Sequence, residues 1–236
     1  MSFGEVVTPP CQGLRMYVEW AARLPHVIAW RSTVPPGRPP ARILPDGCLD
    51  VIWQDGSVFI AGPDTAAQLG TAPPGSRFFA LRFAVGTGPG VLGVPADELT
   101  DRQVPLDAVC PAAEVRRLSE APDPIAALEA FALRRWREPE RAMVAVAAGA
   151  RAGRPVAAIA EDCGLSPRHL RRRCQSTFGY GPKTLARILR LQQAVALARA
   201  GRPFADVSVT AGYADQAHLS RDVKALAGVP LGELVG

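Results

Sequence analysis

The N-terminal half of the chain alternates short apolar segments with turn-forming clusters. Clusters of Pro, Gly and Asp, such as PDG at 45–47, favour tight turns and antiparallel pairing. A short apolar piece around Met16 to Leu24 is predicted to be helical. Four later segments, rich in Val, Ile, Trp and Phe, are predicted strands: VIAW (27–30), CLDVIW (48–53), SVFIAG (57–62) and RFFALRFA (77–84). This pattern predicts a small β-barrel or β-sandwich.

Beyond Pro95 the apolar residues recur every three or four positions, which is the spacing of helices. Pro95 begins a short helix, and the helices over 112–118 and 124–136 are expected to pack on the β-structure or on a second copy of it. From Pro139 onward the chain is predicted to be helical throughout. The pattern predicts an α+β fold in three parts: a β-rich effector or dimerisation domain (1–111), a helical linker region (112–138) and an all-α domain (139–236).

Two segments of the third part share one plan: GLSPRHLRRRCQSTFG (164–179) and GYADQAHLSRDVKALAG (212–228). In each, a glycine that can adopt the left-handed conformation follows a short helix, and Ser166 or Asp215 can then cap a second helix. A small residue four positions before that glycine, Ala160 or Ser208, lets the two helices cross closely. The plan is that of a helix-turn-helix unit, present twice.

The second helix of each unit has one apolar and one polar face. Predicted to face inward at helical spacing are Leu170, Cys174 and Phe178 in the first unit, and Leu219, Val223 and Leu226 in the second. Predicted to face outward are Arg168, Arg171, Arg172 and Gln175 in the first unit, and Gln216, Ala217, Ser220, Arg221 and Lys224 in the second. The outward faces are rich in groups that donate hydrogen bonds, as DNA binding requires.

Between the units, residues 182–200 are predicted to form one amphipathic helix of about 18 residues, or about 27 Å. A strut of this length can hold two helices roughly one DNA turn (about 34 Å) apart, in successive major grooves. Charge supports a polyanionic partner, because residues 139–236 carry fourteen Lys and Arg against seven Asp and Glu, whereas the whole chain has a net charge of only +5.

The last 80 or so residues resemble the double helix-turn-helix domain of AraC-type transcription regulators. The resemblance rests on IAEDCGLSPRHLRRR, FGYGPKTLARILRLQQAVALA and VSVTAGYADQAHLSR, followed by GVP. It implies that the positions facing DNA are Arg168, His169, Arg171 and Arg172 in the first unit, and Gln216, Ala217, His218, Ser220 and Arg221 in the second. Ser166 is a further candidate contact. The family usually has Phe where this chain has Cys174 and Val223, which predicts smaller cores, and Asp222 adds an acidic group beside the second helix.

Residues 15–110 or so resemble an uncharacterised β-rich domain found in front of AraC-type DNA-binding modules. LPDGCLDVIW, FIAGPDT and RFFALRFAVGTGPGVLGVPADELTDRQVPL carry this resemblance. It brings no assigned ligand, and by analogy it implies an effector or dimerisation module.

Several residues allow two interpretations. Arg172 and Arg221 can read guanine or anchor phosphate. His169 and His218 can touch DNA or serve packing and capping. The group formed by Asp46, Cys48 and Asp50 can bind a polar or cationic ligand, although an Asp-Gly hairpin turn is favoured. Aromatic residues on strands usually belong to the core rather than to a pocket, and this applies to Trp20, Trp30, Trp53 and Phe79.

No catalytic residue, cofactor or metal site is predicted. The N-terminal half contains a single histidine, His26, and no G-x-S-x-G motif occurs. The cysteines are scattered without a C-x-x-C pair and are expected to be reduced thiols, mostly buried: Cys11, Cys48, Cys110, Cys163 and Cys174. Because no apolar run is long enough to cross a bilayer and no signal peptide is recognised, a cytoplasmic protein without a membrane partner is expected.

The predicted function is a sequence-specific transcription regulator, an activator or a repressor, whose two helix-turn-helix units bind double-stranded promoter DNA. RNA polymerase, a small-molecule effector and a second copy of the chain remain open as further partners. Two alternatives come from other classes. One is a bifunctional protein whose N-terminal domain is an enzyme that uses Cys48 with Asp46 or Asp50, and the other is a nonspecific architectural DNA binder.

Overall fold

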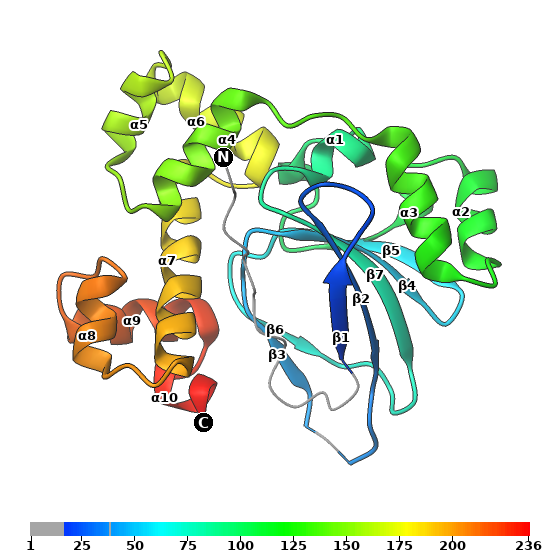
Figure 1. Ribbon diagram of the computed structural model, residues 1–236, viewed down its shortest axis with the longest axis horizontal. Coiled ribbons are helices and arrows are strands. Elements are labelled where there is room, and N and C mark those ends of the chain that lie inside the picture. Colours follow the sequence, from blue (N-terminus) through cyan, green and yellow to red (C-terminus); the bar gives the residue numbers. More distant parts are fainter. Residues whose placement is uncertain (1–16, 38) are drawn as a thin grey trace.

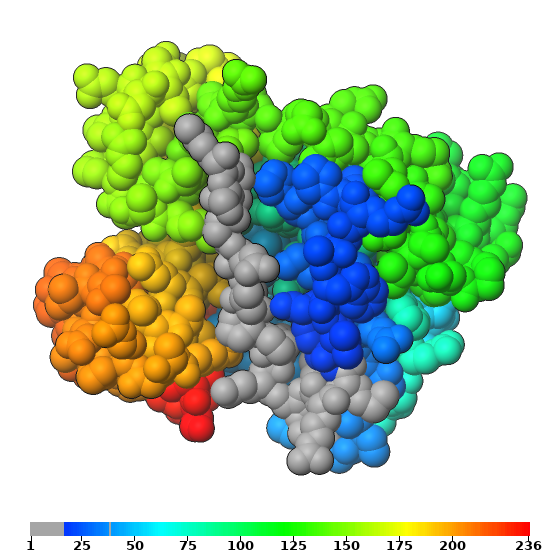
Figure 2. Space-filling model, in the orientation of Figure 1, coloured from blue at the N-terminus to red at the C-terminus, as the bar shows by residue number. Residues whose placement is uncertain are grey.

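The computed structural model describes residues 17–37 and 39–236, and Met16 and Cys11 therefore lie outside the described residues. A β-rich domain and a helical domain lie side by side (Figure 1). In the space-filling view the helical domain has two lobes, one for each end of its long central helix (Figure 2). The structure confirms the predicted α+β fold with its β-rich N-terminal domain.

An antiparallel sheet forms the centre of the β-rich domain, in the order β1-β2-β7-β4-β5-β8. It is open, with β1 and β8 at its edges, and does not close into a barrel. Its strands are β1 (Val18–Ala21), β2 (Val27–Thr33), β4 (Leu49–Gln54), β5 (Ser57–Ala61), β7 (Arg77–Phe83) and β8 (Gln103–Pro105). Two short strands, β3 (Ala41–Ile43) and β6 (Gln68–Gly70), pair separately. All four strands predicted from the sequence are present.

Helices cover one face of the sheet. They are α1 (Gly88–Leu92), α2 (Ala112–Ser119) and α3 (Pro124–Arg135), with the 3-10 turns η1 (Ala96–Glu98) and η2 (Leu106–Ala108). Leu118 of α2 and Phe131 of α3 are buried in the same core as Val51 and Leu81 of the sheet. Of the two predicted packings for these helices, the structure shows the one on the β-structure of their own chain.

The helical prediction around Met16 to Leu24 is wrong, because Val18–Ala21 is strand β1. Its backbone pairs with β2, Val18 opposite Arg31 and Ala21 opposite Ile28. A four-residue piece gains more from pairing with an existing strand than from a weak helical spacing, and Val and Trp are residues that favour strands. Helix α1 was not predicted either, because its GPGVL sequence has the composition of a loop.

The helical domain contains α4 (Arg141–Arg151), α5 (Val156–Asp162), α6 (Pro167–Phe178), α7 (Pro182–Arg199), α8 (Phe204–Thr210), α9 (Gln216–Ala227) and α10 (Leu231–Val235). It has two cores. The first half of α7 contributes Leu185 and Ile188 to the core around α4, α5 and α6, and its second half contributes Leu191 and Val195 to the core around α8, α9 and α10. None of the helices described is long and apolar enough to cross a membrane.

Candidate nucleic-acid interface

Two helix-turn-helix units form the candidate site, α5–α6 and α8–α9, and we call α6 and α9 the reading helices. Each begins at the cap that the sequence predicted. Ser166 Oγ accepts a hydrogen bond from the amide of His169 at 3.3 Å, and Asp215 Oδ1 accepts one from the amide of His218 at 2.6 Å. These bonds satisfy amide groups that the first turn of a helix leaves unpaired.

The inward faces of both reading helices are as predicted. Each of the six apolar residues is at most 4% exposed: Leu170, Cys174, Phe178, Leu219, Val223 and Leu226. Ala160 and Ser208, the small residues of the first helices, are also buried. The two units therefore hold their reading helices by the same close packing, with smaller residues at Cys174 and Val223 than the family usually has.

The outward faces reach solvent. Of the predicted DNA contacts, the exposed ones are Ser166, Arg168, His169, Arg171, Arg172, Gln216, Ala217, Ser220, Arg221 and Lys224, and the half-buried ones are Gln175 and His218. Within the described part of the chain, the basic side chains of this set form no ion pair or hydrogen bond. Their charges are therefore available to a phosphate backbone.

Asp222 lies inward and not beside the DNA-facing surface. It is 7% exposed, and its Oδ1 accepts hydrogen bonds from Arg187 of α7, at 2.8 Å from Nε and 2.5 Å from Nη2. The acidic group that the sequence placed next to the second reading helix thus binds that helix to α7. The equivalent residue of α6, Arg173, forms an ion pair with Glu140 in front of α4.

The two histidines differ in their surroundings. His169 is exposed, whereas His218 is half-buried, and its Nδ1 accepts a hydrogen bond from the amide of Ala214 at 3.3 Å. The His218 ring also stands edge-on to Tyr213, with 5.2 Å between the ring centres. These contacts support a packing and capping role for His218.

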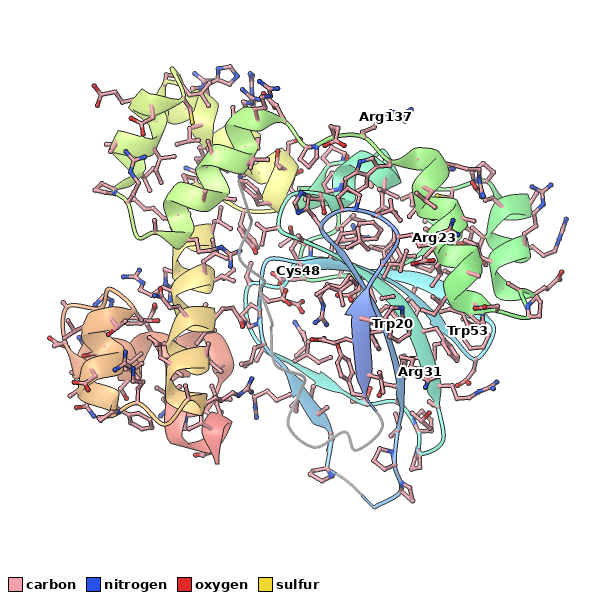
Figure 3. The ribbon with its side chains drawn as sticks, viewed as in Figure 1. Trp20, Arg23, Arg31, Cys48, Trp53 and Arg137 are labelled. Carbon is pink, nitrogen blue, oxygen red and sulfur yellow. The ribbon has the colours of Figure 1, made fainter. Side chains whose placement is uncertain are left out.

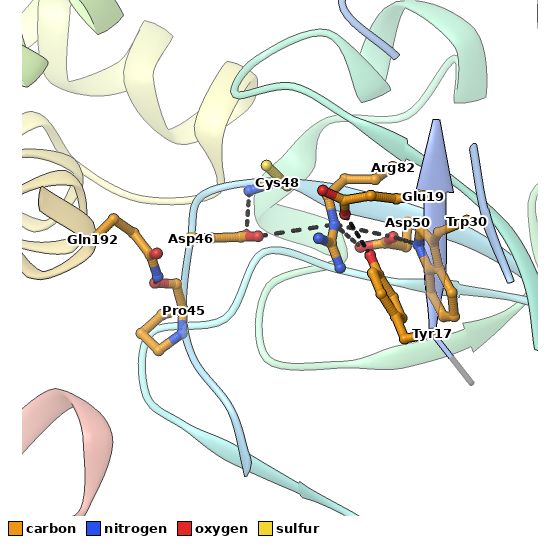
Figure 4. Close-up of polar contacts among 9 residues, drawn as sticks. All are labelled: Tyr17, Glu19, Trp30, Pro45, Asp46, Cys48, Asp50, Arg82 and Gln192. Carbon is orange, nitrogen blue, oxygen red and sulfur yellow. Dashed lines mark hydrogen bonds and ion pairs between the residues drawn. The ribbon is translucent and has the colours of Figure 1, made fainter. Parts of the chain in front are cut away.

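In the β-rich domain, the Asp46-Cys48-Asp50 group is centred on Arg82 (Figure 4). Asp46 Oδ1 accepts a bond from the Cys48 amide at 2.8 Å, as in the predicted turn. Asp50 Oδ1 accepts one from Trp30 Nε1 at 2.6 Å and lies 3.4 Å from Arg82 Nε. Burial raises the pKa of Asp50 although Arg82 opposes this. Arg82 was not among the residues predicted for this group, and it lies directly opposite Asp50 on the neighbouring strand β7.

The surroundings of Cys48 disfavour its thiolate form. Burial raises the pKa of its thiol well above the ordinary value, and the nearby carboxylate of Asp46 raises it further. A reactive cysteine requires a lowered pKa, because the thiolate is the nucleophile. The cysteines of the described residues are all free thiols, and no three His, Cys, Asp or Glu side chains among those residues are grouped to hold a metal ion.

The aromatic residues of the sheet divide between core and surface. Trp30 and Trp53 are 8% exposed and lie in the apolar clusters on the sheet. Phe79 packs edge-on against Trp53, with 5.5 Å between the ring centres. Trp20 on the edge strand β1 is 38% exposed (Figure 3). Trp30, Trp53 and Phe79 therefore serve packing, which was the favoured interpretation.

A pocket of about 400 Å³ lies where the two domains meet at the end of α6. Thr87 and Pro89 line it from the β-rich domain, Arg137 from the connecting segment, and Ser176 and Thr177 from α6. A molecule bound there would touch both domains and the connection between them.

Comparison with known proteins agrees with this architecture. The sequence profile of a helix-turn-helix domain matches residues 159–235, and that of a domain of unknown function, DUF6597, matches residues 7–105. No curated protein matches the chain. An apo point variant of ToxT from Vibrio cholerae strain SCE256 is 11% identical over 91% of this chain and 98% of its own, with a TM-score of 0.50. This likeness shows a shared fold.

A probable AraC family transcriptional regulator from Rhodopseudomonas palustris CGA009 is 24% identical over 41% of this chain and 95% of its own, with a TM-score of 0.36. The two domain matches agree with the paired helix-turn-helix units and the β-rich domain seen in the structure. The chain therefore carries an AraC-type helix-turn-helix domain with a DUF6597 domain in front of it.

Proposed function

We propose that this regulator recognises a specific two-part sequence in promoter DNA, one reading helix entering each of two successive major grooves. The observation that carries the proposal is the repeated exposed basic face on α6 and α9. The two units are joined by the 18 residues of α7, which span about 27 Å. Helices on a strut of this length suit grooves that repeat about every 34 Å.

The exposed basic residues are proposed to divide two tasks. Arg172 and Arg221 occupy equivalent positions, two residues after the shared His-Leu pair, and are proposed to donate to guanine. Arg168, Arg171 and Lys224 are proposed to contact phosphates, which fixes the register of each helix on the duplex. The same surface also includes Gln175, Gln216, Ala217 and Ser220. At the start of α6 lie Ser166 and His169, where the backbone amides of the helix N-terminus favour phosphate binding.

The β-rich domain is proposed to be the effector or dimerisation module, with the pocket at the end of α6 as its candidate effector site. A domain division near residues 137–140 is part of this proposal, and the packing of α2 and α3 on the sheet and of α4 on α7 supports it. A cytoplasmic regulator of this kind would act on RNA polymerase as an activator or repressor.

Selection of bound duplexes from a random pool tests the proposal. The full chain should enrich two short conserved elements separated by roughly one helical turn. A nonspecific architectural binder would enrich no motif, and that result would overturn the proposal.

Arg172→Ala then tests the proposed division of tasks. The variant should lose preference at one or two base pairs of the first element, a loss of about 1–3 kcal/mol in discrimination. Arg202→Ala removes the same charge from an exposed position outside the reading helices and serves as the matched control. Equal weakening on all sequences would show that Arg172 holds phosphate instead.

A further inference from the structure

The β-rich domain contacts the C-terminal end of the first reading helix. Thr100 Oγ1 lies 3.0 Å from the carbonyl oxygen of Gly179, the residue that ends α6, and 3.1 Å from that of Ala96, so its hydroxyl can donate to either carbonyl. The approach is so close that a Cβ on Gly179 would lie 2.3 Å from Thr100 Oγ1 and 2.7 Å from Pro63. A Cβ on Gly86 would lie 2.7 Å from the ring of Phe178. The end of α6 is therefore fixed to the β-rich domain.

The same domain contacts the C-terminal end of the second reading helix through its small β3–β6 sheet, which lies beside α9 (Figure 1). The amide of Ala67 donates to the carbonyl of Leu226 at 2.7 Å. Arg42 Nη1 donates to the carbonyl of Ala227 at 2.9 Å. Both carbonyls belong to the last turn of α9, which leaves them without partners inside the helix.

These contacts suit helix C-termini for a physical reason. The last turn of a helix presents unpaired carbonyls with a partial negative charge, and it is stabilised by N–H donors and by cations such as Arg42. A third contact joins the domains between the two helices, because Gln192 Nε2 of α7 donates to the carbonyl of Pro45 at 2.6 Å. One sheet domain thus holds both reading helices and the strut that connects them.

The contacts leave the DNA-facing surfaces uncovered. They lie at the C-terminal ends of α6 and α9, whereas the exposed polar faces begin in the first turns, with Arg168 on α6 and Gln216 on α9. The β-rich domain therefore touches the reading helices without competing with DNA for Arg172 or Arg221. Such contacts can control the position and orientation of the two reading helices, and they do not block the access of DNA to them.

We propose that the β-rich domain sets the distance and angle between the two reading helices, so that Arg42 and Thr100 are positioning residues which determine the spacing of the two DNA elements. This inference rests on the proposed function. With α7 alone as a connection, rotation or bending of either unit changes the span between α6 and α9. Contacts to one domain restrict both ends, and the protein then discriminates between duplexes whose two elements are differently separated.

The test measures the affinity of the full chain for duplexes that carry the selected motif with its own spacer, with spacers one or two base pairs longer or shorter, and with one element only. A second element within reach adds on the order of 100-fold in affinity. The wild-type chain should lose about tenfold when the spacer changes, because the second helix is then misplaced. Arg42→Ala and Thr100→Val should bind a single element within about twofold of wild type but show a spacer preference of only about twofold.

Three further variants make this result specific. Arg42→Lys keeps a cationic donor and should restore part of the spacer preference. Arg31→Ala and Thr71→Val remove the same groups from exposed positions of the β-rich domain, and Arg31 lies on β2, far from the helical domain (Figure 3). Both controls should behave as wild type. Thermal unfolding of each variant identifies any loss of folded protein.

The outcomes separate the two proposals. If the wild-type chain enriches a two-part motif but Arg42→Ala and Thr100→Val weaken binding equally at every spacing, the β-rich domain contributes stability only and the positioning proposal fails. If the wild-type chain enriches no two-part motif, the proposed function fails and the positioning proposal fails with it.

Discussion

The two helix-turn-helix units share one backbone plan and differ in charge. Both reading helices begin at a side-chain cap and end at a glycine in the left-handed conformation, Gly179 with a φ of 85° and Gly228 with a φ of 76°. Yet α6 carries four arginines and no acid, whereas α9 carries one arginine, one lysine and Asp222. The fold therefore requires the caps, the glycines and the apolar positions, and leaves the electrostatics of each helix free to differ.

At one pair of equivalent positions the two units differ even in the sign of the charge. Arg173 of α6 and Asp222 of α9 have opposite charges, yet both form an ion pair with a residue outside their own helix. The partners are Glu140 for Arg173 and Arg187 for Asp222. The position faces another part of the domain in both units, so a charged residue of either sign is stabilising when its partner is complementary.

The largest expected effect follows from the unequal charge of the two helices. Replacing Arg168, Arg171 and Arg172 with Ala should weaken DNA binding on the order of 100-fold or more at 0.15 M salt. It should lower the slope of log K against log salt by about 2, since Arg168 and Arg171 are the proposed phosphate contacts and each contact contributes about 0.9. Replacing Arg221 and Lys224 should lower the slope by about 1, because Lys224 is the proposed phosphate contact of this pair. Titrations at several salt concentrations measure both values.

One result would contradict this expectation. If the pair on α9 lowers the slope as much as the triple change on α6, the second unit supplies as much phosphate contact as the first. The inequality seen in the charges would then have no consequence for binding. Arg202→Ala, outside both reading helices, should leave the slope unchanged.

The next effect concerns stability at positions 173 and 222. Asp222→Ala should lower the free energy of unfolding by about 2 kcal/mol, because the buried carboxylate accepts two bonds from Arg187. Arg173→Ala should cost less, about 0.5 kcal/mol, since the Glu140 side chain is 58% exposed and can be solvated. Urea unfolding of the two variants gives the comparison. Equal losses would show that burial of Asp222 does not strengthen its ion pair.

Local features explain why these units could be predicted from the sequence. The caps Ser166 and Asp215, the glycines after each first helix and the four-residue apolar spacing all act within one or two turns of chain. Strand β1 was mispredicted because its structure depends on a neighbouring strand, and Arg82 was missed because its partner Asp50 lies 32 positions away. The contacts from Arg42 to Ala227 and from Thr100 to Gly179 join still more distant residues, and no local pattern predicts them.

A smaller effect is expected at the helix starts. Ser166→Ala and Asp215→Ala should each cost about 1 kcal/mol in the free energy of unfolding, because each leaves a first-turn amide unpaired. Asp215→Ala should cost more than Ser166→Ala by a few tenths of a kcal/mol. Its carboxylate makes the shorter bond, 2.6 Å against 3.3 Å, and a negative charge is favourable at a helix N-terminus. Urea unfolding should show this order, and the reverse order would contradict it.

The smallest effect is expected at two buried tyrosines, one near each unit. Tyr180 beside the first unit and Tyr213 in the turn of the second are 6% and 5% exposed, and neither hydroxyl has a hydrogen-bond partner among the described residues. Burial raises the pKa of both phenols, since each lacks the solvent that would stabilise its charged form. Replacing either residue with Phe removes a desolvated polar group while keeping the ring, so the free energy of unfolding should stay unchanged or rise by up to about 1 kcal/mol. A loss of more than about 1 kcal/mol in Tyr180→Phe alone would mean that its hydroxyl binds an ordered water or another group at the junction with the β-rich domain, and the two units would then differ in how their buried tyrosines are satisfied.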